Sequence, residues 1–299
     1  SIFDFLMPGL LGTRESFAKR FESPVEHAEG DSAARLQALV SPFVLRRVKE
    51  DVVDDLPEKI EDTVVAQLTG EQRKLYLANQ DRIAQQVQHR EAGEFKKDKL
   101  KVLAELTKLR QICCDPRLHY EDYKAGSAKL DACMELVHGA LDGGHRILLF
   151  SQFTGMLDII GKRLAKEDIA FLKLTGASSK ESRAKMVAQF QAGEVPVFLI
   201  SLKAGGVGLN LTAADVVIHY DPWWNVAAQD QATDRAHRIG QQHTVTVYKL
   251  IAKDTIEERI MQMQESKRDL VNSVLGGDGI SSALFTREDV LALLGGEGR

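Results

Sequence analysis

The sequence predicts an α/β fold: a parallel sheet with helices on both faces, preceded by a mainly helical protrusion and linker region. From about residue 127, short apolar runs alternate with amphipathic helical patterns. This alternation is typical of a parallel sheet that helices cover on both sides. Residues 1 to about 126 instead show charged helical patterns, with a strand signal only near Thr63–Leu68.

Composition fits a globular protein and argues against several kinds of site. The chain has 299 residues, of which 44% are hydrophobic and 27% are charged, and its net charge is −4. Without a global positive field, any contact with nucleic acid requires a local basic patch. The cysteines, Cys113, Cys114 and Cys133, are odd in number and form no CxxC pair, which argues against a disulfide framework and a metal site. No apolar run is long enough to cross a membrane, and we expect an intracellular protein of the cytoplasm or nucleoid, or of the nucleus in a eukaryote.

Two long helices are expected in the first region. One spans about 69–89 and begins at Thr69-Gly70-Glu71-Gln72, which resembles a capping box. The other spans about 95–113 and carries a leucine every three residues, which we interpret as core packing, with coiled-coil pairing as the alternative. Its lysines indicate a solvated face or, as the alternative, a phosphate-facing patch. The leucines are Leu100, Leu103, Leu106 and Leu109, and the lysines are Lys96, Lys97, Lys99 and Lys101.

The second region contains the sheet. Ligands of such sheets bind at the carboxyl ends of the strands. The expected strands are Ile147–Phe150, Phe171–Leu174, Val197–Ile200, Val216–His219 and Val245–Leu250. The helices expected between them are Gly155–Glu167, Lys180–Ala192 and Val226–Arg238.

Two packing helices are expected after the last strand. Thr255 and Glu258 have the spacing of a capping box at the start of the first helix. A glycine-rich break at 276–279 precedes a short final helix that begins near Thr286. The predicted domains are therefore a helical linker and protrusion region at 1–126, a sheet domain at 127–270 and a helical brace at 271–299.

The stretch QATDRAHRIGQ, residues 231–241, is the strongest chemical signal. On a helix, Gln231, Arg235 and Arg238 share one face, because they are four and three residues apart. Two guanidinium groups and an amide suit an anion such as phosphate. An arginine finger accelerates phosphoryl transfer by roughly 10³–10⁵. The alternative is a surface helix whose arginines pair with Asp230 and Asp234.

Four further loops at strand ends carry groups that suit phosphate or nucleic acid. They are SLKAGGVGLNL at 201–211, DPWWN at 221–225, SQFT at 151–154 and TGASS at 175–179. Glycine lets backbone N–H groups approach a phosphate closely, and hydroxyl groups donate to phosphodiester oxygens. A tryptophan stacks on a base or enters a groove. Taken one at a time, the glycines are also typical of a tight turn and the hydroxyls of helix caps, and we expect Asn225 as an N-cap.

The order of these motifs resembles the Swi/Snf-type DNA translocases, which belong to superfamily 2 of helicase-like ATPases. ILLFSQFT, LTGASS, VFLISLKAGGVGLNLTAADVVIHYDPWWN and QATDRAHRIGQ are similar to motifs IV, IVa, V and VI of that family. Upstream, PFVLRRVKEDV, LPEK and LRQICCDP are similar to its blocks between the two motor lobes. The resemblance covers nearly the whole chain and implies that 127–270 is the second RecA-like lobe.

The resemblance also implies a role for each matching residue. Arg235 and Arg238 would be arginine fingers, with Gln231, Gly208 and Asn210 at the nucleotide. The positions implied to face DNA are Ser151, Gln152, Thr175, Gly176, Ser201, Lys203 and Trp224. Those implied to tie the lobes together are Arg46, Arg47 and Lys49.

The sequence departs from the family pattern where the first lobe would be. It contains no GxxxxGK[ST] phosphate loop and no DExH string, and it begins without an initiator Met, so we expect a piece of a longer protein. ATP and Mg²⁺ would be bound mainly by that missing N-terminal lobe, and the isolated chain would be inactive. The implied partners are double-stranded DNA, the N-terminal lobe and a nucleoprotein or transcription complex, without a membrane. The alternatives are a strand-separating helicase lobe and a non-catalytic protein or DNA interaction module.

Overall fold

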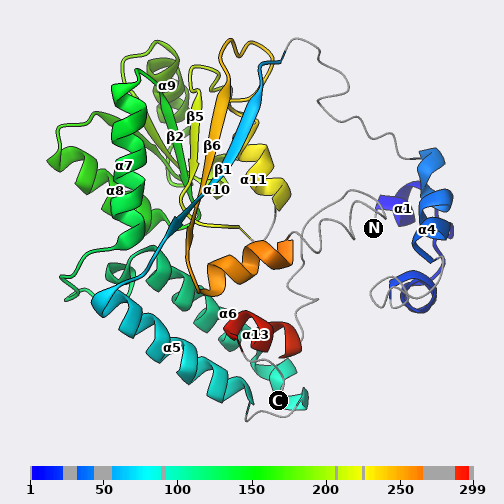
Figure 1. The fold of residues 1–299 in the computed structure, drawn as a ribbon. Coiled ribbons are helices and arrows are strands. Elements are labelled where there is room, and N and C mark those ends of the chain that lie inside the picture. The colour runs from blue at the N-terminus through cyan, green and yellow to red at the C-terminus, as the bar shows by residue number, and fades with distance from the viewer. Residues whose placement is uncertain are drawn as a thin grey trace. The chain divides into compact units, whose positions relative to one another are not determined.

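A computed structural model of the chain describes residues 2–22, 32–43, 56–88, 92–205, 208–223, 226–264 and 287–295 (Figure 1). The chain divides into two compact units. The first comprises Ser1–Val52 with Glu265–Gly277, and the second comprises Val53–Gln264 with Asp278–Arg299. Within the described residues, no helix combines the length and the apolar character that crossing a bilayer requires.

The first unit is helical in its described part. Thr13 begins α2, and its hydroxyl accepts a hydrogen bond from the backbone N–H of Ser16 at 3.3 Å. A small core holds the helices together through Phe21, Leu36 and Val40. The elements are α1 (Ile2–Leu6), α2 (Arg14–Phe17), the π-helical turn Ala18–Glu22, α4 (Ser32–Val40) and the 3₁₀ turn Ser41–Phe43.

The second unit is built on a six-stranded, wholly parallel sheet in the order β1-β6-β5-β2-β4-β3. Every residue of β2, β4 and β5 is buried, which explains why these strands read as continuous apolar runs. All five expected strands are confirmed. The strands are β1 (Lys59–Ala66), β2 (Ile147–Ser151), β3 (Phe171–Leu174), β4 (Val197–Ser201), β5 (Val216–His219) and β6 (Val245–Ala252).

The strand β1 is the element that the sequence marks least clearly. It lies at the edge of the sheet and pairs with β6 from Lys59 opposite Val245 to Ala66 opposite Ala252. Most of its residues are exposed, so it lacks the apolar run of a central strand, and the signal near Thr63–Leu68 marks only its second half. The segment before residue 126 therefore contributes a strand to the sheet as well as helices.

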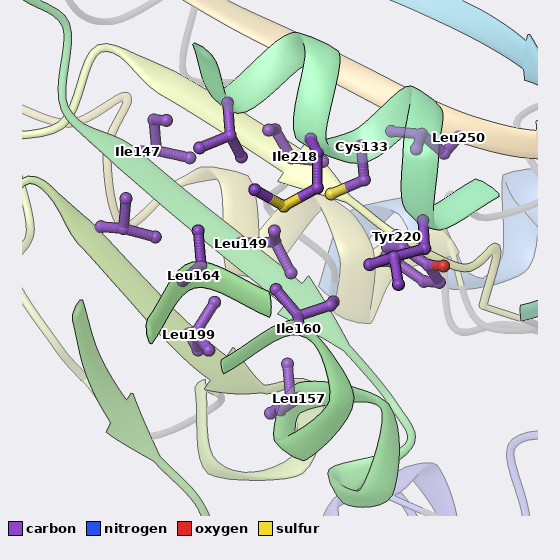
Figure 2. Packing of buried hydrophobic residues seen from close by; sticks show 14 of the residues in the cluster. Cys133, Ile147, Leu149, Leu157, Ile160, Leu164, Leu199, Ile218, Tyr220 and Leu250 are labelled. Carbon is purple, nitrogen blue, oxygen red and sulfur yellow. The ribbon is translucent and has the colours of Figure 1, made fainter. Parts of the chain in front are cut away.

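Helices cover both faces of the sheet, as predicted. On one face, α7 and α8 pack on the sheet in a single hydrophobic cluster. Figure 2 shows part of this cluster, with Cys133 of α7 and Ile160 and Leu164 of α8 around Leu149 of β2. On the other face, residues of α9, α10 and α11 pack against the intervening strand positions, including Leu148 and Phe150. The helices are α7 (Ala128–Asp142), α8 (Thr154–Lys166), α9 (Lys180–Gln191), α10 (Leu202–Gly205) and α11 (Val226–Thr233).

A second helical layer lies at one end of the sheet (Figure 1). It consists of α5 (Gly70–Gln88), α6 (Ala92–Cys114), the helical residues 256–264 and α13 (Arg287–Leu294), which share one hydrophobic cluster; the 3₁₀ turn Pro116–Leu118 follows α6. The last carbonyls of α13 receive side-chain donors, from Arg259 to Leu293 at 2.9 Å and from Gln80 to Leu294 at 2.7 Å. The final helix thus braces this layer.

Two local expectations in this layer need correction. Leu100 is 81% exposed, whereas Leu106 and Leu109 are buried. At 3.6 residues per turn, three steps of three residues place Leu100 about 180° from Leu109, so the leucines do not form one face. The capping box at Thr69 is also not formed, because the Gln72 side chain donates to the carbonyl of Ile112 at 3.0 Å and accepts from Ala128 N–H at 3.1 Å.

The expected capping box at Thr255 is shifted by one residue. The Thr255 hydroxyl accepts from the N–H of Glu257 at 3.2 Å, and the Glu258 carboxylate accepts from the N–H of Asp254 at 2.8 Å. Asp254 has a positive φ of 54°, and this turn directs its N–H toward Glu258. The signal therefore located the start of the helix correctly but assigned the wrong backbone donor to Glu258.

A fully buried ion pair joins the helical layer to the sheet domain. Lys129, at the start of α7, lies 2.8 and 2.9 Å from the two carboxylate oxygens of Glu257. The same carboxylate accepts the N–H of Ala252 at 2.9 Å, and the ammonium lies over the Tyr220 ring at 5.1 Å. These contacts satisfy both charges, which burial without partners would make very costly.

Replacing Lys129 by Met is expected to lower the free energy of unfolding by about 3–5 kcal/mol, because it leaves the Glu257 carboxylate buried without its counter-charge. Urea denaturation followed by circular dichroism measures this loss. Lys124→Met, at an exposed position, is the matched control and is expected to leave stability nearly unchanged. An equal effect of the two substitutions would contradict the structural importance of the pair.

Candidate functional site

The predicted ligand-binding loops leave the sheet at one edge. Phe150 of β2 is in register with both Ile200 of β4 and His219 of β5, and Leu174 of β3 is in register with Ile200. All four strands are parallel, so the segments after them begin at the same level of the sheet. The sequence prediction that the loops share the carboxyl edge is therefore confirmed for the segments after these four strands. The arginine stretch was expected at the same edge, but His237 bonds the carbonyl of Pro57, before β1, and Gln241 bonds that of Ala214, before β5.

The segment with the two predicted arginine fingers is not a continuous helix. The helix α11 ends at Thr233, and residues 234–238 form successive turns, so the expected common helical face of Gln231, Arg235 and Arg238 is wrong. The carbonyl of Arg235 accepts the N–H of Leu211 at 3.0 Å instead of an intrahelical N–H. This contact ties the arginine turn to the glycine-rich loop and takes the chain out of helical geometry.

Gln241, the last residue of the arginine stretch, fixes this turn. Its buried side-chain amide donates to the carbonyl of Ala236 at 3.1 Å and to that of Ala214 at 2.8 Å. Its side-chain oxygen accepts the N–H of His243 at 3.0 Å. The sequence analysis assigned no role to Gln241, because its partners Ala214 and Thr212 lie 27 and 29 residues earlier in the chain.

The two arginines form an electropositive pair. Arg235 is 8% exposed, whereas Arg238 is exposed. The pKa of Arg235 is lowered, first by burial and then by the positive charge of Arg238, while Asp234 acts in the opposite direction. An anion beside the two guanidinium groups would relieve their mutual repulsion. Gln231 is exposed on the last turn of α11.

The glycine-rich segment has an exposed part between anchored residues. Leu209 and Leu211 are buried in the core, whereas Gly208 and Asn210 are exposed. Gly208 has a φ of +37°, which an L-residue rarely adopts, and the space around its Cα is open. Residues 206 and 207 lie outside the described part of the chain. The segment therefore presents exposed backbone next to Leu211, whose N–H donates to the carbonyl of Arg235.

The predicted DNA-facing residues fall into two groups. Thr175 is half-buried, and Gly176 and Lys203 are exposed, so all three are accessible at the carboxyl edge. Ser151 and Ser201 are buried, and the Ser151 hydroxyl donates to the Asp221 carboxylate. The expectation that these two hydroxyls face a phosphate backbone is corrected, because parallel strands bury residues up to their last position here.

Side-chain hydrogen bonds hold Gln152 and the TGASS loop in place. The side-chain oxygen of Gln152 accepts from Arg110 at 3.1 Å, while its side-chain nitrogen is buried without a hydrogen-bond partner. Ser179 is the N-cap of α9, as favoured from the sequence, and accepts the N–H of Ser182 at 3.1 Å. The hydroxyl of Thr175 accepts the N–H of Ala177 at 3.3 Å.

The tryptophan loop is described up to Trp223. This side chain is half-buried and packs against the hydrophobic cluster on the α9–α11 face of the sheet. Trp224 and its neighbour Asn225 lie outside the described residues. The three residues predicted to tie the lobes together, Arg46, Arg47 and Lys49, also lie outside them.

His219 is a buried polar residue that the sequence analysis did not single out. It ends β5, stacks on Phe150 at 5.5 Å and shares a hydrogen bond of 2.8 Å with the hydroxyl of Thr233, the last residue of α11. Burial, followed by the charge of Lys249, lowers its pKa to about 3. In the sequence, the only indication of this buried site is a histidine at the end of an apolar run, and that pattern does not identify its hydrogen-bond partner.

Comparisons with known proteins agree on one family. A model of the helicase conserved C-terminal domain matches residues 128–240, and a model of the SNF2-related domain matches residues 1–118. A putative ATP-dependent helicase/translocase of Bacillus subtilis is 40% identical over 96% of this chain. The chain spans 28% to 32% of the length of the first such curated relatives.

Solved structures of similar proteins share the fold. The Sulfolobus solfataricus SWI2/SNF2 ATPase C-terminal domain is 31% identical, with a TM-score of 0.64, over 79% of this chain and 98% of that one. The SWI2/SNF2 ATPase core of the same organism, solved in complex with dsDNA, is 36% identical, with a TM-score of 0.66, over 98% of this chain and 62% of that one. The sheet is therefore RecA-like, as the motif resemblance implied.

The buried imidazole of His219 is expected to make stability depend on pH. Its folded pKa of about 3 lies below the ordinary value of 6.5, so the unfolded chain takes up the proton first as pH falls. Stability is complete above pH 6.5 and is lost progressively toward pH 3, by about 2 kcal/mol between pH 7 and pH 5.

Urea unfolding of the wild type and of His219→Gln, measured from pH 7 to pH 5, isolates this effect. Glutamine keeps a polar group near Thr233 but does not titrate, so the variant is expected to lose less stability on acidification. Identical slopes for the two proteins would show that His219 is not the titrating group.

Proposed function

The chain belongs to the Swi2/Snf2 family of helicase-like ATPases, and from this membership we propose that it is the C-terminal half of an ATP-dependent translocase on double-stranded DNA. The observation that carries the proposal is the arginine pair in the turn after α11. Arg235 and Arg238 lie in one turn, their charges repel each other, and this turn is bonded to the loop with Gly208 and Asn210. Such a site suits the polyphosphate of a nucleotide.

In this proposal Arg235 and Arg238 are the arginine fingers. Arg238 is exposed and can reach an external phosphate, whereas burial fixes Arg235 behind it. Their guanidinium groups would stabilise the charge that develops on the γ-phosphoryl group during transfer. Gln231, Gly208 and Asn210 would lie beside the nucleotide. The turn geometry supports this role as well as a helix would, because the proposal needs the two groups close together and not one helical face.

ATP and Mg²⁺ would be held mainly by an N-terminal lobe, and this chain would complete the site when the lobes close. The groups of the arginine turn and of the glycine-rich segment are donors and cations that fit phosphate oxygens. Within the described part of the chain, no cluster of three His, Cys, Asp or Glu side chains could hold a metal ion. The residues at hand thus fit the nucleotide as phosphate ligands from one side.

The carboxyl edge of the sheet would contact the DNA backbone. Lys203, Thr175 and Gly176 are accessible there and offer a cation, a hydroxyl and a backbone N–H. These groups bind phosphates without reading sequence, as a translocase requires. Two similar proteins also support this contact: the Sulfolobus core was solved with dsDNA, and the Bacillus relative is described as a putative helicase/translocase. Because the net charge is −4, binding would be local and weakened by salt.

The isolated chain is expected to show no DNA-stimulated ATPase activity, because its sequence has no phosphate loop to hold ATP and Mg²⁺. Phosphate release measured with and without duplex DNA tests this expectation. Joining the chain to an ATP-binding first lobe of the family is expected to restore activity, which is the positive control. Turnover by the purified isolated chain would overturn this part of the proposal.

In the two-lobe protein, Arg238→Ala is expected to lower the ATP turnover rate by roughly 10³-fold, the lower range for loss of an arginine finger, while DNA affinity changes little. Steady-state ATPase assays and fluorescence anisotropy with duplex DNA measure the two quantities. Arg163→Ala is the matched control, since Arg163 pairs with Glu167 on α8 at the protein surface. Arg235→Lys complements it at the buried position, because lysine keeps the charge and loses the planar donor fork. Equal losses of turnover and DNA affinity would assign the arginines to the fold.

A further inference from the structure

Arg110 is the largest fully buried side chain among the described residues, and the proposed function assigns it no role. It lies near the end of α6 and is 1% exposed. A guanidinium removed from water is costly unless several partners satisfy it. The identity of those partners therefore indicates the role of Arg110.

The partners of Arg110 come from two loops at the carboxyl edge. Its guanidinium donates to the main-chain carbonyl of Pro222, after β5, and at 3.1 Å to the side chain of Gln152, after β2. It lies 4.0 Å from the carboxylate of Asp221 and 5.7 Å from the centre of the Phe153 ring. One side chain of the helical layer thus holds both loops at once.

Asp221 completes this buried cluster from the other side. Its carboxylate accepts from the Ser151 hydroxyl and, at 3.3 Å, from the backbone N–H of Gln152. The Arg110 and Asp221 side chains are almost completely buried. The pair therefore fixes where the loops after β2 and β5 begin relative to each other.

The next residue of the loop is held by two further elements. The carbonyl of Trp223 accepts from the side chain of Gln264, in the helical residues 256–264. Its N–H donates to the side chain of Gln229 in α11 at 3.4 Å. Asp221–Trp223 is consequently bonded to α6, to α11 and to the helix after β6, so its backbone position depends on all three.

We propose that Arg110 is a positioning residue that sets the backbone of the loop Asp221–Trp223 through its bonds to Pro222 and Gln152. The geometry favours positioning over stability alone, because the donor reaches a main-chain carbonyl of the loop rather than only a counter-charge. Where the proposed function holds, the consequence is that helix α6 determines how the tryptophan loop meets DNA. The positioning itself does not depend on that function.

Tryptophan fluorescence reports on this loop directly, because Trp223 and Trp224 are the only tryptophans of the chain. Intrinsic tryptophan fluorescence and its quenching by acrylamide are measured on the folded chain carrying Arg110→Lys. Lysine retains the positive charge beside Asp221 but cannot bridge two acceptors with a planar fork. The expected result is emission at longer wavelength and stronger quenching than in the wild type, at an unchanged circular dichroism spectrum.

Arg82→Lys is the matched control. Arg82 pairs with Glu105 between α5 and α6, so the same substitution perturbs the same helix pair away from the loop. It is expected to leave tryptophan emission and quenching at their wild-type values. Wild-type emission and quenching in Arg110→Lys would overturn the proposal, as would an equal change in both variants.

A double variant keeps the test decisive if Arg110→Lys does not fold. Arg110→Gln with Asp221→Asn removes both buried charges, so neither is left without its partner. Asparagine still offers an oxygen to Ser151 and to the backbone of Gln152. The same increase in quenching is expected in this folded variant, and wild-type quenching would contradict positioning by Arg110.

Binding of duplex DNA separates this inference from the proposed function. Affinity of Arg110→Lys for DNA is expected to fall about tenfold, the effect of losing one hydrogen bond to a charged group, while Arg82→Lys binds as the wild type does. If wild-type chain binds no DNA but the fluorescence differs as expected, the proposed function fails and positioning stands. If wild-type chain binds DNA and Arg110→Lys matches it in affinity and in quenching, the proposed function stands and positioning fails.

Discussion

The register of β2 against β4 and β5 is the constraint on which the candidate site depends, because it sets where each functional loop begins. The strands themselves specify this register weakly, since all their residues are apolar or buried on both faces. Buried polar groups at the strand ends specify it more strongly: Ser151 bonds Asp221, and His219 bonds Thr233. A slipped strand would leave these groups unsatisfied, at a cost of about 1–3 kcal/mol each.

The contrast between apolar strands and polar strand ends explains which elements could be predicted from the sequence. Central strands such as β4 are apolar up to their last residue, so their position follows from the apolar run Val197–Ile200. The edge strand β1 is mostly exposed and carries charged residues, so its pairing with β6 depends on a long-range contact that no local pattern encodes. The helical layer shows the same contrast: α6 was predicted, but the face that it buries was not, because a three-residue repeat drifts around the helix.

The local geometry of the arginine stretch was not predicted from the sequence. Arg235 and Arg238 were identified from residue type and spacing, yet the chain leaves the helix before both of them. The cause is a bond from the N–H of Leu211 to the Arg235 carbonyl, between residues 24 positions apart, together with the buried amide of Gln241. Ser151 and Ser201 show the converse error, because both are buried at their strand ends and the Ser151 hydroxyl donates to a buried carboxylate. Only the packed structure distinguishes these outcomes.

Buried polar side chains hold segments that are distant in sequence at fixed positions relative to each other. Lys129 and Glu257 join α7 to the helix after β6, and that helix carries Gln264, which bonds Trp223. Arg110 joins α6 to the same loop from another direction. A buried charge tolerates little displacement from its partners, since its solvation cannot be replaced by water. The loops at the carboxyl edge therefore take their positions from the helical layer as well as from the sheet.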